Sequence, residues 1–253
     1  MKKRKKARIL EFTLVIIAIL LALILVFYGL MYKPTKTEHE FYTIKFDVLS
    51  PNANVKAMKV PAVDKEGKGV ITLIVVEAMP GVGRTLVDIN NLLFWADTQE
   101  SIRKARDVAA NYTGMNLENY DLIYHIYANA SVVGGPSAGA ALTVLTIAAL
   151  LNKSIRDDVM ITGAINYDGS IGLVGDILKK AKIAKENGAT LFLVPLTQSK
   201  EIGYEEKEVC KKYGNVEYCT IEQKPKIIDI GNEVGINLIE IKDINDAVSY
   251  MLI

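Results

Sequence analysis

The sequence has few of the residues that bind metals or cross-link a small fold. It contains only two cysteines, two histidines and one tryptophan among 253 residues. The cysteines and histidines are too scattered for a recognisable zinc site, and there is no HExxH motif, so we expect no metal and no cofactor. Cys210 and Cys219 lie nine residues apart. In an extracytoplasmic domain they form a disulfide closing a small loop, or they are two unrelated buried thiols.

The chain also has almost no net charge, but its N-terminal segment is positively charged and the remainder is negatively charged. The formal charge is +1 at pH 7, yet six of the 30 basic residues fall within the first eight positions. From Lys33 onward there are 24 basic and 28 acidic residues, a net charge of −4. A domain of this balance has no electrostatic footprint for nucleic acid, so we exclude nucleic-acid binding.

One apolar run accounts for the high mean hydropathy of +0.20. Phe12 to Met31 carries no charge and, at about 20 residues, is long enough to cross a bilayer as a helix. Because positive residues stay in the cytoplasm, we expect a single-pass anchor in the cell membrane, with the N-terminus cytoplasmic and the rest extracytoplasmic. A cleaved signal peptide is the alternative, although the run is long for one and no small-residue cleavage site follows.

The chain beyond this run alternates strand-like and helix-like segments. We predict a basic N-terminus over 1–11, a transmembrane helix over 12–32, a linker over 33–40 and one α/β domain over 41–253. The expected strands are 41–49, 55–63, 69–77, 121–127, 158–165 and 190–195. The expected helices begin near Asp97 or Thr98, at Ser137 and near Asp176, and further alternation of helix and strand ends in a helix over 243–252.

Ser137 occupies a position typical of a helix start. It follows Gly134, Gly135 and Pro136 and opens the small-residue helix predicted over 137–151. Unpaired backbone N–H groups and the positive end of the helix dipole stabilise developing negative charge there, as a nucleophilic serine requires. Serine is also a favoured N-cap, so the pattern fits a tight turn with a capping residue as well.

A lysine falls within the apolar stripe of the helix predicted over 176–187. On a helical projection Lys180 lies beside Ile177 and Ala181, whereas Lys179 lies on the opposite side. Burial lowers the pKa of a lysine, so that its neutral amine can act as a base near pH 7. The alternative is snorkelling, in which the stem packs on the core and the amine reaches water.

Three ordered segments resemble one known family. GGPSAGAALTVLTIAALLN, VMITGAI and GLVGDILKKAKIAKENGATLFLVP are similar to the proteolytic domain of Lon, the ATP-dependent serine–lysine protease. In that family the nucleophile lies in a GPSAG motif and the lysine lies 43 residues later, which is the spacing of Ser137 and Lys180. The resemblance covers residues 69–195. It implies an α/β (α+β) fold of the Lon proteolytic-domain-like, ribosomal protein S5 domain 2-type architecture.

The resemblance also implies supporting residues. Thr162, in the segment ITGAI, matches a threonine that contacts the catalytic lysine in the family. His125 falls where the family often has a histidine on the strand entering the active site. Gly135 and Pro136 belong to the loop at the oxyanion site, where backbone N–H groups are expected to bind the oxyanion; Pro136 has none to offer.

Some positions depart from the family. Gly134 and Ala164 stand where relatives carry acidic residues, and residues 196–240 contain an insertion with both cysteines. PGVGRT, at 80–85, ends like a phosphate-binding loop, but Ala78 and Arg84 replace the required glycine and lysine, so we interpret it as a glycine-rich turn. We therefore expect no ATP-driven unfolding by this chain itself, and a separate ATPase partner stays an open question.

The sequence thus predicts a membrane-anchored serine endopeptidase with a Ser137–Lys180 dyad. The substrate would be a polypeptide, and homo-oligomerisation is implied by the resemblance, because isolated Lon domains form rings. Two other functions stay open. One is a catalytically silent Lon-fold scaffold or binding module. The other is a small-molecule kinase of the galactokinase and homoserine kinase group, whose glycine- and serine-rich loop binds phosphate at a helix start.

Overall fold

The computed structural model describes residues 52–88, 96–128 and 135–253. The chain divides into two compact units, residues 1–47 and 48–253, and every described residue belongs to the second. The strand predicted over 41–49, the linker and the predicted transmembrane helix over 12–32 lie outside the described residues. Within the described ranges, no helix is both long enough and apolar enough to span a membrane.

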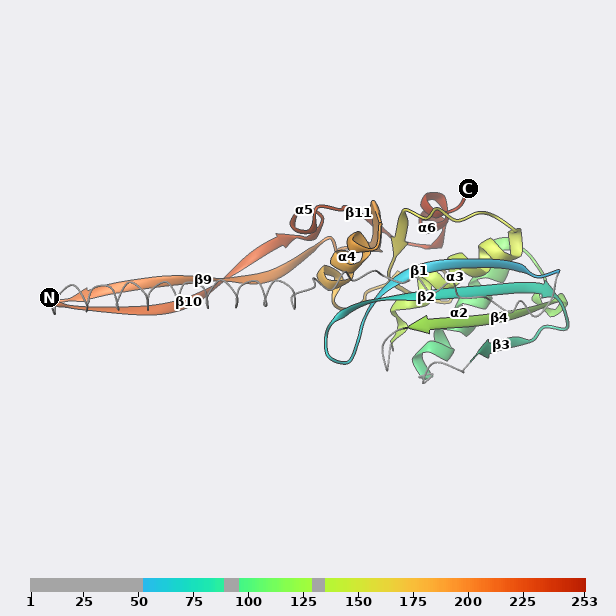
Figure 1. Ribbon diagram of the computed structural model, residues 1–253, viewed down its shortest axis with the longest axis horizontal. Helices are drawn as coiled ribbons and strands as arrows, with labels where there is room; N and C mark the ends of the chain where they lie inside the picture. Colours follow the sequence, from blue (N-terminus) through green and yellow to red (C-terminus); the bar gives the residue numbers. More distant parts are fainter. Residues whose placement is uncertain (1–51, 89–95, 129–134) are drawn as a thin grey trace, which may run out of the picture. The chain divides into compact units, whose positions relative to one another are not determined.

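A four-stranded sheet forms one layer of the domain (Figure 1). Its strands run in the order β1-β2-β4-β3. β2 is antiparallel to both β1 and β4, and β3 is parallel to β4. Their bounds are Asn54–Val63, Gly69–Pro80, Tyr120–Ala128 and Thr85–Asp88 for β1, β2, β4 and β3. Alternate residues such as Ile74, Tyr124 and Ile126 face the main core, as the two-residue period of a strand requires.

Two helices pack with this sheet around the main core. α2 (Ala96–Thr113) packs on α3 (Gly139–Leu151), and α3 in turn packs on β1 and β2. Every residue of α3 from Gly139 to Leu150 is buried. A helix that is apolar all round must lie inside the protein, so α3 is the central helix of the domain. The hydroxyls of Thr143 and Thr146 are satisfied by donating to backbone carbonyls one turn earlier.

A second, parallel sheet follows, with the strand order β11-β8-β5. The strands span Asn237–Ile241, Leu191–Pro195 and Val159–Ile161. α4 (Ile177–Glu186) and α5 (Ile230–Val234) bury apolar side chains with this sheet in a second core cluster that includes Ile177, Phe192 and Ile230. α6 (Ile244–Met251) closes the chain against α3 and β5.

The glycine-rich turn is a structural element rather than a phosphate site. It connects β2 to β3, a short strand that the sequence analysis did not predict. The carboxylate of Asp121 accepts hydrogen bonds from the backbone N–H groups of Val82 and Arg84, each at 2.9 Å, and it also forms an ion pair with the Arg84 guanidinium. The anion held by this turn is therefore the chain's own carboxylate.

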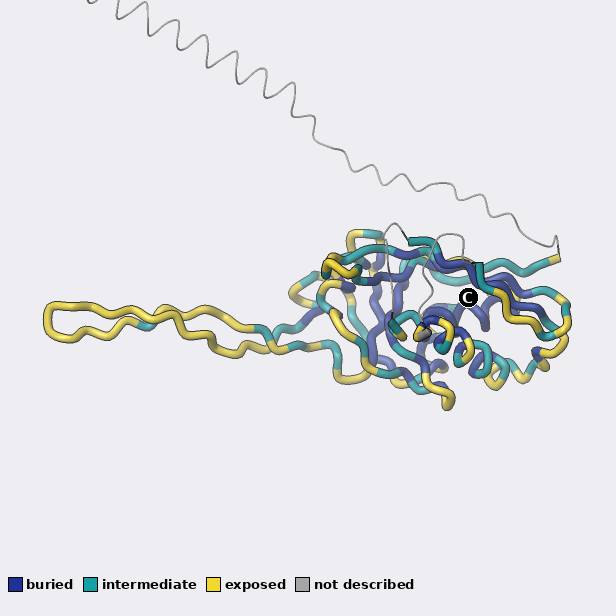
Figure 2. Tube along the Cα trace, turned by 90° about the horizontal axis from the view of Figure 1, so that it is seen from below, coloured by how far each residue is buried: buried dark blue, intermediate teal, exposed yellow. Residues whose placement is uncertain are grey.

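The expected alternation of helix and strand in the C-terminal third is wrong for residues 200–229. This segment forms one long antiparallel hairpin, β9 (Lys200–Tyr213) with β10 (Val216–Asp229). Its residues are mostly exposed, including Ile202, Tyr204 and Tyr218, so almost none of it belongs to the core (Figure 2). The sequence of such a segment carries no helical or strand-like hydrophobic periodicity, because its apolar side chains are not buried in the core of the domain.

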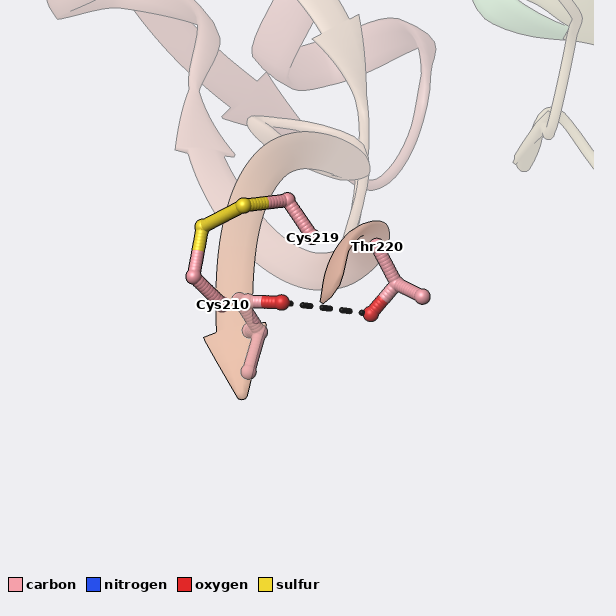
Figure 3. Close-up of a disulfide and its surroundings, with 4 residues drawn as sticks. Cys210, Cys219 and Thr220 are labelled. Atoms are coloured by element: carbon pink, nitrogen blue, oxygen red, sulfur yellow. Dashed lines mark hydrogen bonds between the residues drawn. A yellow bond between two sulfur atoms is a disulfide. The ribbon is translucent and has the colours of Figure 1, made fainter. Parts of the chain in front are cut away.

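The two cysteines pair directly across this hairpin. Cys210 and Cys219 occupy opposite register positions and form a disulfide (Figure 3). Beside it, the hydroxyl of Thr220 donates to the backbone carbonyl of Val209 at 3.4 Å. A two-stranded hairpin alone is marginally stable in water, so this cross-link limits the separation of the two strands.

A close backbone contact joins the start of α3 to β6 (Ala164–Ile165), a short strand paired with β7 (Ile171–Gly172). A Cβ atom added to Gly139 would lie 2.7 Å from the backbone nitrogen of Ile165 and 2.8 Å from its Cγ2. Only glycine allows this approach, so the packing of the helix start on β6 depends on Gly139.

We predict that Gly139→Ala lowers the free energy of unfolding by about 1–3 kcal/mol, since overpacking of a filled site costs that much. Gly175→Ala is the matched control, because an added Cβ there meets no atom within 4 Å. Urea unfolding of the two variants measures the difference. Equal midpoints for both variants would show that β6 moves away from the helix without cost.

Candidate active site

The backbone around Ser137 is shaped by its neighbours in the GGPSAG motif. Gly135 has a φ of 105°, a conformation that favours glycine. Pro136–Ala138 then form a single 3-10 turn, and α3 begins at Gly139. The predicted helix start at Ser137 is therefore a tighter turn that runs into α3. Gly134 lies outside the described residues.

Hydrogen bonds fix this turn against the end of β5. The carbonyl oxygen of Ser137 accepts from the backbone N–H of Gly163 at 3.0 Å and from the Thr162 hydroxyl at 3.4 Å. In return, the N–H of Ala140 donates to the carbonyl of Gly163 at 3.0 Å. Thr162 is fully buried. The segment ITGAI thus holds the main chain of the serine directly, which the sequence analysis did not predict.

The Ser137 side chain does not cap the helix. Ala138 is the N-cap residue of α3, and no side-chain hydrogen bond caps either α3 or the preceding turn. The Ser137 hydroxyl makes no hydrogen bond with any residue in the described ranges. Instead, Ser137 lines a small cavity together with Gly135 and Ala138. The capping alternative is therefore wrong, and the hydroxyl is available for chemistry.

Lys180 is buried, as the helical projection predicted. It lies on α4 with only 4% of its surface exposed, in line with the buried residues Ile177, Ala181 and Ala184. The snorkelling alternative is therefore excluded. Burial of the ammonium lowers the pKa of Lys180 to about 8, although the negative charge of Asp176 acts in the opposite direction.

Lys180 differs from its neighbour in having no partner. Lys179 forms an ion pair with Asp176 at 3.0 Å, and both side chains are about half exposed. The Lys180 amine makes no hydrogen bond or ion pair within the described part of the chain. It is therefore not bonded to Ser137 or to Thr162 in this structure. α4 packs on β1 and β2, the two strands that contribute most of the cavity lining beside Ser137.

The structure does not bring His125 to Ser137. In β4 the residues Tyr124 and Ile126 face the main core, and Ile126 lines the cavity beside the serine. Side chains alternate along a strand, so His125 points to the opposite face of the sheet. There its ring nitrogens lie 2.9 Å from Glu77 Oε1 and 3.3 Å from Asp88 Oδ2. The supporting role that the resemblance implied for His125 has no geometric basis here.

The cavity contains residues that the sequence analysis missed. Its wall is formed by β1, β2, β4 and the first turn of α2, and includes Pro61, Thr72, Ile74, Thr98 and Ile126. Strand periodicity places Thr72 and Ile74 on one face of β2, but it does not show that this face meets the serine. Only the tertiary fold provides that information.

One group of possible metal ligands lies within the described ranges. Glu208, Cys210 and Cys219 place their ligand atoms within 4.8 Å of one another. Both sulfurs are used in the disulfide, so neither is available as a thiolate. This group lies on the exposed hairpin and has no part in the Ser137 site.

Residues 95–230, more than half of the chain, match the sequence model of the Lon protease (S16) C-terminal proteolytic domain. The chain belongs to this Lon proteolytic-domain family. The mixed α/β architecture agrees with that assignment, and the matched range contains Ser137, Thr162 and Lys180. The strands β1 and β2, which form part of the cavity wall beside Ser137, precede the matched range.

The curated proteins that this chain resembles are much longer than the segment that matches it. The Lon protease of Lawsonia intracellularis is 29% identical over 57% of this chain and 18% of its own length. Lon protease 2 of Thermus thermophilus is 24% identical over 68% of this chain and 21% of its own length. The Lon protease of Phenylobacterium zucineum is 34% identical over 40% of this chain and 13% of its length. The chain thus matches about a fifth or less of each of these curated relatives.

The burial of Lys180 makes stability depend on pH. The pKa of about 8 in the folded protein lies below the ordinary lysine value of 10.5, so the unfolded chain binds more protons between these two pH values. Stability contributed by this group therefore rises from pH 8 to 10.5 and is constant below pH 8.

We predict that this rise, on the order of 3 kcal/mol, disappears in Lys180→Met and persists in the exposed control Lys179→Met. Urea unfolding across that pH range measures it. If the free energy of unfolding changes with pH equally in both variants, Lys180 is hydrated in solution.

Proposed function

We propose that this protein is a serine endopeptidase in which Ser137 is the nucleophile and Lys180 is the general base. One observation carries the proposal. Lys180 is buried, neither its amine nor the Ser137 hydroxyl bonds to another side chain in the described ranges, and both residues lie in the matched Lon domain at the family's spacing. A buried amine with a pKa of about 8 is substantially neutral in mildly alkaline solution, as a base must be.

In the proposed first step, the neutral Lys180 amine removes the proton from the Ser137 hydroxyl. The serine oxygen forms a bond to the peptide carbonyl carbon, and the electron pair of the carbonyl moves to its oxygen. Lys180 then gives its proton to the leaving nitrogen as the peptide C–N bond breaks, which leaves an acyl-enzyme. The hydrogen bond between the two residues forms when substrate binds, since catalytic hydrogen bonds often tighten only at that stage.

In the second step, Lys180 removes a proton from water and the resulting hydroxide attacks the ester. Collapse of the intermediate releases the acid product and returns the proton to the Ser137 oxygen. Backbone N–H groups at the turn before α3 stabilise the oxyanion in both steps, because the first N–H groups of a helix have no partner inside the helix. Ser137 supplies one such group, whereas Pro136 has no N–H.

Thr162 acts in this proposal as a positioning residue. Its hydroxyl and the Gly163 N–H hold the carbonyl of Ser137, so they set the direction of the serine relative to the cavity. Thr162 has no hydrogen bond to Lys180 in this structure, so its proposed role concerns the serine.

The proposal extends to location and assembly. The uncharged run at 12–31 with its basic flank supports a single-pass anchor that places the peptidase domain outside the cytoplasm. Homo-oligomerisation rests on the family resemblance. A polypeptide substrate follows from the proposed reaction, and it agrees with the similarity of this chain to Lon proteases.

Peptide hydrolysis by the full-length chain in detergent tests the dyad. We predict that Ser137→Ala and Lys180→Met each reduce kcat by at least about a thousandfold, because the nucleophile and its base act as a unit. Lys179→Met, the exposed neighbour, is expected to retain activity. In the unaltered chain kcat rises with pH as a group with a pKa near 8 loses its proton.

Circular dichroism of each variant shows whether the fold is intact. If Lys180→Met hydrolyses peptides at the normal rate, another group is the base. If the unaltered chain shows no Ser137-dependent hydrolysis, the protein is a scaffold with a Lon fold.

A further inference from the structure

The cavity beside Ser137 contains a buried polar group without a partner. Thr72, on β2, is 97% buried, and its hydroxyl forms no hydrogen bond with any described residue. Among the buried side-chain polar atoms of the described residues, it is the one left without a partner. An unpaired buried hydroxyl lowers the stability of the folded protein. Its presence is therefore better explained by binding of a ligand than by folding.

The surroundings of Thr72 are otherwise apolar. The cavity wall from β1 is made of Val60, Pro61 and Ala62, and β2 and β4 add Ile74 and Ile126. Val60 lies opposite Thr72 in the β1–β2 register. A valine would suit such a wall and would leave no polar group unpaired, because valine and threonine have nearly the same shape.

The position of Ser137 defines what would enter this cavity. The serine lines the same cavity as Thr72. In the proposed reaction the serine oxygen becomes bonded to the carbonyl carbon of the acyl-side residue, and the side chain of that residue branches from the adjacent Cα. The cavity is therefore close enough to accept the acyl-side side chain.

The size of the cavity limits that side chain. Its volume is about 30 Å³. A group the size of a water molecule or a methyl needs about 10–15 Å³, so a cavity of this volume suits a small side chain. A threonine or a valine side chain ends in two small groups, whereas an aromatic ring is considerably larger.

We propose that this cavity is the acyl-side specificity pocket and that Thr72 makes it select a small side chain with a hydroxyl, threonine in preference to valine. This inference rests on the proposed peptidase function. The hydroxyl of the substrate gives Thr72 the hydrogen-bond partner that it lacks, whereas valine leaves Thr72 unpaired in a site from which water is displaced. Selectivity therefore comes from hydrogen bonding, and the apolar wall sets the size limit.

The test compares kcat/KM for three matched peptides that differ only in the acyl-side residue: threonine, valine or phenylalanine. For the full-length chain we expect threonine to exceed valine by about five- to tenfold, the effect of one hydrogen bond between neutral groups. Phenylalanine is expected to be the poorest substrate. In Thr72→Val the threonine-to-valine ratio falls to one or below, while Thr72→Ser keeps the hydroxyl and the preference.

A stability measurement separates this role from a structural one. Because the Thr72 hydroxyl has no partner, Thr72→Val is expected to have a Tm equal to or above that of the unaltered chain. An unchanged threonine-to-valine ratio in a folded Thr72→Val, or no preference in the unaltered chain, overturns the pocket assignment and leaves Ser137-dependent hydrolysis in place. Absence of Ser137-dependent hydrolysis on every peptide overturns the proposed function, and this inference with it.

Discussion

The organisation of the site depends on the hydrogen bonds between the serine turn and the end of β5. Two donors, from Thr162 and Gly163, converge on the carbonyl of Ser137, and Gly163 accepts from Ala140 in return. These bonds join the start of the central helix to a strand of the second sheet. A Cβ atom on Gly139 would lie 2.7 Å from the backbone nitrogen of Ile165, so the absence of a side chain at Gly139 allows the helix start to approach this segment closely. The serine is thereby placed at the boundary between the two sheets.

The proposed chemistry depends on which polar side chains have hydrogen-bond partners and which have none. Asp121 is fully engaged with its turn, and the hydroxyls of Thr143 and Thr146 donate to their own helix. In contrast, Ser137 and Thr72, which line the same cavity, make no side-chain hydrogen bond with a described residue, and neither does the buried Lys180 on α4. Proteins generally pair buried polar groups, so a cavity lined by unpaired hydroxyls is a place where a substrate can supply the partners.

Much of the fold follows from local sequence patterns. Val55–Val63, Gly69–Glu77 and Asp121–Tyr127 alternate or run apolar as strands do, and the structure confirms them as β1, β2 and β4. Helical periodicity placed Lys180 within the apolar stripe but left snorkelling open, and the structure shows that the residue is buried. The hairpin 200–229 was not predicted, because its strands pack on no core and their charged residues hide any pattern. β3 was missed because four residues are too few for a period to be recognised.

Residues of the candidate site could be proposed from the sequence only where a motif pointed to them. Ser137 and Lys180 came from a short motif and a spacing, while His125 was assigned by resemblance and lies on the wrong face of the sheet. Thr72 had no signal at all, because its importance comes from sharing a cavity with Ser137, which only tertiary structure shows.

The central claim is that burial of Lys180 makes Ser137 a nucleophile. Its most direct measurement is the rate at which a fluorophosphonate labels Ser137 in the full-length chain, followed by mass spectrometry across pH 6–10. We expect an adduct on Ser137 that forms at a rate rising with an apparent pKa near 8, and we expect Lys180→Met to lose this pH-dependent rise. A labelling rate that is the same in the unaltered chain and in Lys180→Met at every pH would contradict it.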